Sequence, residues 1–322
     1  MKLLAQLIKL FDLISRYEMN IYRYPSQYIR LKKQGWNKFK HYFENSLHEN
    51  KQENHQPVVN KKTFFKPLKS ILKRESTPEE EVTNRSYVFG QEDDEQEVPG
   101  FHIDYQFTSK PKTEEELKQR FLDGLFEFQV KWASSTIREK SYLDKDLYDE
   151  DTLKYFLQRF PDNYLVLYHP VFLVQRAPVE LEVVMISPTE TWCITVLEGK
   201  ENSVFIGSKE RFWTEKYLEE EKKHLNPVIA INRMEKVVNQ IYNNYQIDLP
   251  IRKVILNRTG YFDFPYSPPD ILFIDKRKYE GWFRNLRKHS SPIKHVQLKA
   301  AQVLLQHCQT TYVKRPEWNT PE

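Results

Sequence analysis

The chain has 322 residues, enough for two ordinary domains or for one domain with appended segments. Its 49 Lys and Arg residues against 45 Asp and Glu residues make it only mildly basic, so the overall charge by itself indicates no polyanionic partner. Two cysteines, Cys193 and Cys308, exclude a disulfide framework and a cysteine-rich zinc site, and they favour a cytoplasmic location.

Residues 1–45 are predicted to form a basic amphipathic helical segment. They carry nine basic and three acidic residues. The apolar residues near the start are interrupted by Lys9, Asp12 and Arg16, so no uncharged run is long enough for a transmembrane segment or a secretory core. We expect the apolar face to pack against the body of the protein or against another protein. The alternative is contact with an anionic membrane surface.

The second half of this segment combines an aromatic face with a basic face. Ile29, Trp36, Phe39 and Phe43 recur at helical spacing. The other face carries four bases, which are Lys32, Lys33, Lys38 and Lys40. One hypothesis is that these lysines contact nucleic acid or another acidic surface. The other, which we favour, is a solvated charged face above a packed aromatic one.

Residues 46–112 are predicted to be a disordered linker. They are rich in Asn, Gln, Glu, Lys and Pro, and they include an acidic block at residues 79–81 and 92–95. Such a composition offers too little apolar surface to offset the entropy lost on ordering.

Residues 113–290 are predicted to form one globular domain, and residues 291–322 a C-terminal helix and tail. A capping box at Thr113 and Glu116 opens a helix with an apolar face. Strands are expected over residues 164–174, 179–188 and 191–199, and again over residues 251–257 and 270–274. Asn226 and Pro227 open a helix between the two groups of strands. The order predicts an α/β fold with a central mixed sheet covered by helices.

The globular part also carries a set of motifs in a characteristic order. They are Gly124 and Glu127 in the first helix, the turn-linked strands from Glu182 to Leu197, the run Arg211, Phe212 and Trp213, the Asn226-Pro227 helix start, and the strand Val254 to Asn257. With these motifs, residues 113–283 resemble the nuclease-related domain family. The resemblance implies a restriction-endonuclease-like core of helix, three strands, helix and strand, here preceded by a helical N-terminal extension.

The resemblance also implies where an active site would lie. The family has an Asp on the second strand, where this chain has Glu182, and a helix Glu, which corresponds to Glu127. A Glu-x-Lys motif on the next strand corresponds to Thr195 and Leu197, and a later Gln corresponds to Ala230. The hairpin therefore keeps the length found in the family, but it lacks the Glu that would bind the metal and the Lys.

A shifted active site is an alternative. Phosphodiester hydrolysis in this fold uses Mg²⁺ or Mn²⁺ held by carboxylates, with a lysine that activates water. Glu127 and Glu182 would be the metal ligands, and Glu198 with Lys200 resembles a displaced Glu-x-Lys. However, Glu198 and Leu197 lie on opposite faces of a regular strand, so a bulge would be needed to aim the pair at the same site.

Three hypotheses for the function follow. We expect a catalytically inactive nuclease-related module, without a cofactor, that acts in binding or scaffolding on nucleic acid, with Arg211 as a further contact. The second hypothesis is a nuclease that depends on Mg²⁺ or Mn²⁺ and uses Glu127, Glu182, Glu198 and Lys200. The third is a protein-interaction platform with no role in nucleic-acid binding.

Overall fold

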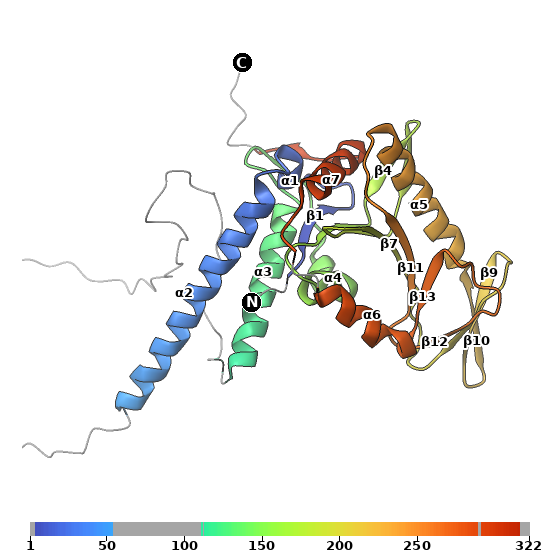
Figure 1. The fold of residues 1–322 in the computed structure, drawn as a ribbon. Helices are drawn as coiled ribbons and strands as arrows, with labels where there is room; N and C mark the ends of the chain where they lie inside the picture. Colours follow the sequence, from blue (N-terminus) through green and yellow to red (C-terminus); the bar gives the residue numbers. More distant parts are fainter. Residues whose placement is uncertain (1–3, 54–110, 112, 289–290, 316–322) are drawn as a thin grey trace, which may run out of the picture. The chain divides into compact units, whose positions relative to one another are not determined.

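The structure is a computed structural model, and it describes residues 4–53, 111, 113–288 and 291–315 (Figure 1). Two compact units are distinguished: residues 33–121 form one, and Met1–Lys32 together with Leu122–Glu322 form the other. Apart from residues 46–53 and 111, the predicted linker lies outside the described residues. Among the described residues, no helix is both long enough and apolar enough to span a membrane.

A six-stranded mixed sheet is the centre of the larger unit. Its strand order is β1-β3-β6-β7-β11-β13. Strand β6 runs antiparallel to its neighbours β3 and β7, and the other pairings are parallel. The six strands are β1 (Gln6–Leu10), β3 (Leu165–Tyr168), β6 (Val183–Ile186), β7 (Thr191–Val196), β11 (Ile251–Leu256) and β13 (Ile271–Ile274).

Helices pack on both faces of this sheet (Figure 1). On one face lies α5 (Pro227–Asn244), whose Tyr242 hydroxyl is 2.7 Å from that of Thr191 on β7. On the other lie α4 (Asp151–Arg159) and α6 (Lys276–Lys288), and there Trp192 of β7 meets Trp282 of α6 in an edge contact at 6.4 Å. The alternating residues of β7 therefore contribute to two separate packed layers.

The predicted α/β class and order of elements are confirmed. Helix α3 (Glu114–Trp132), strands β3, β6 and β7, helix α5 and strand β11 follow one another in the chain, as in a restriction-endonuclease-like core. The expected helix start is confirmed as well, because the Asn226 side chain accepts a hydrogen bond of 3.0 Å from Val228 N and Pro227 occupies the first helical position.

The predicted helix at the very start of the chain is wrong, because Gln6–Leu10 forms strand β1. All five of its residues are buried, and β1 pairs parallel with β3. Lys9, which interrupts the apolar run, is fully buried on this strand and forms an ion pair. A short α1 (Arg16–Met19) and a long α2 (Tyr24–Glu53) follow, so the helical prediction holds from residue 24 onward.

A second sheet, which the sequence did not predict, lies between residues 204 and 263. It is four-stranded, in the order β10-β9-β8-β12. Its core includes the fully buried Trp213, whose ring lies 4.9 Å from that of Phe264. The strands are β8 (Val204–Ile206), β9 (Phe212–Tyr217), β10 (Glu220–Leu225) and β12 (Tyr261–Asp263).

The remaining elements of the larger unit are small. Two-stranded ladders form between β4 and β5 and between β2 and β14. Helix α7 contacts α5, β4 and β6. The bounds are β2 (Glu139–Lys140), η1 (Lys145–Asp149), β4 (Val171–Val174), β5 (Ala177–Glu180), α7 (His295–His307) and β14 (Val313–Lys314).

The smaller unit contains the continuation of α2 and the beginning of α3. Within it, the ring of Phe121 contacts those of Trp36 and Phe39 at centroid distances of 5.3 and 5.5 Å. The predicted aromatic face of the second helix is thus a packing face. The Thr113 hydroxyl accepts a hydrogen bond from Glu116 N at 3.1 Å, as expected of a helix cap.

Candidate functional site

Several polar residues gather at one edge of the central sheet. The carboxyl ends of the five parallel strands share this edge with the amino end of β6. In α/β sheets this is the edge at which ligands usually bind. The residues that follow or precede the strands there are His169, Glu182, Glu198, Arg258 and Asp275.

Glu182 is a largely buried carboxylate one residue before β6. Its Oε2 accepts a hydrogen bond of 3.1 Å from Val196 N at the end of β7. Burial raises the pKa of Glu182 above the ordinary value for a glutamate, and the Val196 hydrogen bond and the nearby His169 only partly oppose this rise. A metal ligand needs the ionised form, which this environment disfavours.

The two positions that carry Glu-x-Lys in the family lie next to Glu182. Thr195 is buried on β7, and its hydroxyl donates to the Met234 sulfur on α5 at 3.7 Å. Leu197 follows β7 with an apolar side chain. Mg²⁺ and Mn²⁺ prefer oxygen ligands, which proteins supply mainly as ionised carboxylates. One carboxylate with a raised pKa, a neutral hydroxyl and a leucine do not fit such an ion.

Glu198 points to the opposite side of the sheet from Glu182. Its carboxylate forms a two-pronged ion pair with Arg258, with 2.5 Å from Nε to Oε1 and 2.8 Å from Nη2 to Oε2. The same guanidinium lies 4.1 Å above the ring of Tyr155 on α4. Glu198 is therefore engaged on the α4 side, as regular strand alternation requires.

Lys200 is directed toward the second sheet. Its ammonium pairs with Glu220 of β10 and lies 5.0 Å from the ring centroid of Tyr217. Its backbone N–H donates to Glu215 Oε1 at 2.9 Å. Glu198 and Lys200 thus have different partners: Glu198 pairs with Arg258, which follows β11, and Lys200 contacts the β9–β10 hairpin.

Glu215 fastens this turn to the second sheet. It is buried, and its Oε2 lies 2.7 Å from His224 Nε2. Burial would raise the pKa of Glu215, but the hydrogen bonds from Lys200 N and His224 outweigh it and hold the pKa below the ordinary value. Gly199 leaves room for this carboxylate, because a Cβ there would lie 1.9 Å from Glu215 Oε1.

Glu127 is exposed on α3, and its charge helps to raise the pKa of Tyr148, after the larger effect of burial. Within the described residues, no contact joins Glu127 to Glu182, and no three acidic, histidine or cysteine side chains are grouped so that they could hold a metal ion.

Residues 145–256 match the family model of the nuclease-related domain. The chain contains a nuclease-related domain. Searches of curated proteins and of solved structures returned no match. The matched range begins at η1 and ends with β11, so it includes the four inner strands of the central sheet. Strands β1 and β13 extend the sheet of the nuclease-related domain at its two edges.

The bases proposed from sequence as nucleic-acid contacts differ in exposure. Lys32 is buried and forms an ion pair with Asp162, which removes it from the surface of the protein. Lys33, Lys38 and Lys40 are exposed on α2, where Lys40 lies 3.7 Å from Glu44. Arg211 is exposed before β9, with its guanidinium 5.6 Å from the Phe212 ring centroid.

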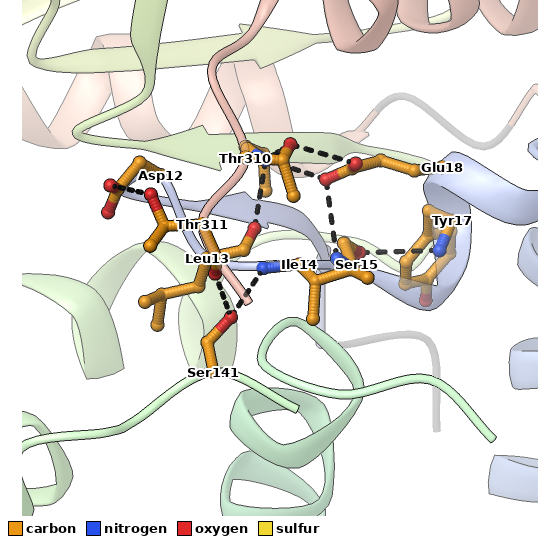
Figure 2. Close-up of polar contacts among 10 residues, drawn as sticks. Asp12, Leu13, Ile14, Ser15, Tyr17, Glu18, Ser141, Thr310 and Thr311 are labelled. Atoms are coloured by element: carbon orange, nitrogen blue, oxygen red, sulfur yellow. Dashed lines mark hydrogen bonds and ion pairs between the residues drawn. The ribbon is translucent and has the colours of Figure 1, made fainter. Parts of the chain in front are cut away.

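One buried polar cluster was not foreseen. Lys9 Nζ donates to Leu13 O and to Thr310 Oγ1, both at 2.8 Å, and pairs with Glu18 at 2.6 Å. Figure 2 shows Glu18, Thr310 and the neighbouring Asp12–Thr311 contact at the carboxyl end of β1. Lys9 and Thr310 are 301 residues apart in the chain, so no local pattern could reveal this pairing. The cluster fastens β1 to the C-terminal segment of the larger unit.

The basic character of helix α6 was also not among the features predicted from the sequence. Six of its 13 residues are Lys or Arg. The run of bases at residues 276–278 and 284–288 is the signal that could have indicated it, but this run lies beyond the range that matches the family.

Proposed function

We propose that the nuclease-related domain of this chain binds nucleic acid without cleaving it. The observation that carries the proposal is the state of the hairpin from Glu182 to Leu197, whose carboxylate is buried and hydrogen-bonded to Val196 N. The nuclease-related fold is retained, while Thr195 stands in the place of the Glu ligand and Leu197 in the place of the lysine.

The contacts of Glu198 and Lys200, the displaced Glu-x-Lys, support the same proposal. A water-activating lysine has to reach the scissile phosphate together with the metal ligands. Lys200 instead pairs with Glu220, and Glu198 is held by Arg258. Moving both groups to Glu182 would require breaking two ion pairs and turning Glu198 through the sheet.

A cleavage assay tests the loss of catalysis. The purified chain would be incubated with plasmid, single-stranded DNA and RNA in Mg²⁺ or Mn²⁺, with an EDTA-treated sample as the metal-free control. We expect no cleavage above that control. Cleavage that disappears in Glu182→Ala but persists in Glu219→Ala, a change of an exposed acid on the β9–β10 turn, would refute the proposal.

A binding assay tests the retained function. Binding of labelled DNA and RNA would be measured by fluorescence anisotropy over a series of salt concentrations. Contact with phosphates releases counterions, so we expect the logarithm of the association constant to fall linearly with the logarithm of the salt concentration. Absence of binding at low salt would instead favour the protein-interaction hypothesis.

A further inference from the structure

The exposed side of α6 is strongly basic. The helix carries six bases and one acid, Glu280. All six bases are exposed, and they are Lys276, Arg277, Lys278, Arg284, Arg287 and Lys288. At 3.6 residues per turn, all of them except Lys278 fall within about a third of the helix circumference. The helix therefore presents a continuous positive stripe.

The apolar side of α6 packs against the rest of the larger unit. Trp282 and Leu286 are buried, and the ring of Phe283 lies 5.5 Å from that of Phe160, the residue that follows α4. Tyr164 of the segment before β3 donates its hydroxyl to Leu286 O at 2.9 Å. These contacts fix the helix against the sheet. They also leave no apolar face for insertion into a lipid bilayer, which an amphipathic membrane helix requires.

Half of the bases have no acidic partner. Arg277 pairs with Asp275, Arg284 with Glu280 and Lys276 with Glu201. In the part of the chain that the structure describes, the other three bases of α6 form no ion pair, and these are Lys278, Arg287 and Lys288. Even the paired Arg277 and Arg284 keep 63% of their side-chain surface exposed. The positive charge is available to a ligand in solution.

We propose that the basic stripe of α6 binds the phosphodiester backbone of nucleic acid. A 13-residue helix is about 20 Å long, enough to lie along several successive phosphates of one strand. Exposed Lys and Arg side chains bind phosphate oxygens without reading bases, so the recognition is independent of sequence. The inference rests on the proposed function and names its surface, which lies outside the range that matches the family.

The test compares two triple variants of equal charge. Arg284→Gln/Arg287→Gln/Lys288→Gln removes three of the five bases of the stripe, including the unpaired Arg287 and Lys288. Lys222→Gln/Lys223→Gln/Lys236→Gln removes three exposed bases from β10 and α5. Both sets lie on the surface, and circular dichroism with thermal melting would check that each variant is folded. Binding of a labelled random-sequence duplex and of a single strand would be measured against salt.

We expect the α6 variant to lose at least tenfold in affinity at low salt, and the magnitude of its salt slope to fall by roughly 2 to 3, because three phosphate contacts are lost. The control variant should change by less than about threefold. If the wild-type chain binds and the α6 variant binds equally well, the stripe is not the interface. If both variants lose the same affinity, the effect is one of net charge, and the inference fails as well.

Other outcomes separate the inference from the function on which it rests. If the wild-type chain binds no nucleic acid, the proposed function fails together with the inference. Polyglutamate and unlabelled duplex would be compared as competitors at equal charge. If polyglutamate displaces the labelled duplex equally well, the specific preference for phosphates is refuted. Binding to phosphatidylserine vesicles that is lost in the α6 variant, while duplex binding persists, would assign the stripe to a membrane surface instead.

Discussion

At the scale of single residues, the buried position of Glu182 changes how its carboxyl group titrates. Burial raises its pKa, so the ionised form is less favourable in the folded protein than in the unfolded chain. The ionised form is therefore a cost to the folded state. That cost is present at high pH and is removed as the pH falls through the folded-state pKa of Glu182.

Glu182→Gln should accordingly increase the free energy of unfolding at pH 7. The gain should shrink as the pH falls through the raised pKa and vanish below the ordinary glutamate value of about 4.3, where the carboxyl group is protonated in both states. Urea unfolding of the variant and of wild type between pH 4 and pH 8 gives this difference. Glu219→Gln, at an exposed position, serves as the control, and an identical pH trend in it would contradict the assignment.

Gly199 should tolerate no side chain while Glu215 keeps its place. A Cβ at residue 199 would lie 1.9 Å from Glu215 Oε1, and Lys200 N and His224 hold that carboxylate. We expect Gly199→Ala to destabilise the protein by about 1–3 kcal/mol, the usual cost of overpacking. Chemical denaturation would measure the loss.

Gly281 is the matched control for this change. It is exposed in the middle of α6, and a Cβ there would meet no atom within 4 Å. Gly281→Ala should therefore stabilise the protein by up to about 1 kcal/mol through helix propensity. If Gly199→Ala costs the same with Glu215 present as in a Glu215→Ala background, the clash is not the cause.

At the scale of elements, β1 depends on a buried ion pair. Lys9 is fully buried, and its ammonium is satisfied by Glu18, Thr310 and Leu13 O. A buried strand can hold a lysine only where such partners neutralise and hydrogen-bond its charge. The edge strand is thereby coupled to the segment that follows α7.

Lys9→Ala should cost about 3–5 kcal/mol of stability, because it leaves Glu18 without its buried partner and opens space beside the sheet. Replacing both charges, in Lys9→Met/Glu18→Gln, should cost less than the single change. Denaturant unfolding would measure the free energy of unfolding of both variants, with Lys222→Ala as the control at an exposed lysine. A loss below about 1 kcal/mol for Lys9→Ala would show that the pair does not hold β1.

At the scale of the whole molecule, the range that matches the nuclease-related domain supplies the four inner strands of the central sheet. These are β3, β6, β7 and β11, of which β6 and β7 form the hairpin, and the edge strands β1 and β13 come from outside that range. Strand β13 leads directly into α6, so the strand that extends the sheet also positions the basic stripe. The cleavage and salt-dependence experiments therefore address different parts of one unit.

Much of the core was predictable because its signals are local. The Asn226 cap with Pro227, the alternation through β7 and the capping box at Thr113 each depend on residues within a few positions of one another. The absence of the Glu-x-Lys motif at Thr195 and Leu197 could also be read from the chain, since the hairpin preserves the spacing from Glu182. These features determine the class of fold and the expected lack of metal ligands.

Only the tertiary structure decided how the remaining polar residues are used. A short apolar run such as Gln6–Leu10 suits a helix face as well as a buried strand, and its conformation depends on β3, more than 150 residues away. Three further features likewise join segments distant in the chain. They are the pairing of Lys9 with Glu18 and Thr310, the pairing of Glu198 with Arg258, and the burial of the apolar side of α6. Local sequence sets propensity, whereas burial and charge pairing are properties of the assembled core.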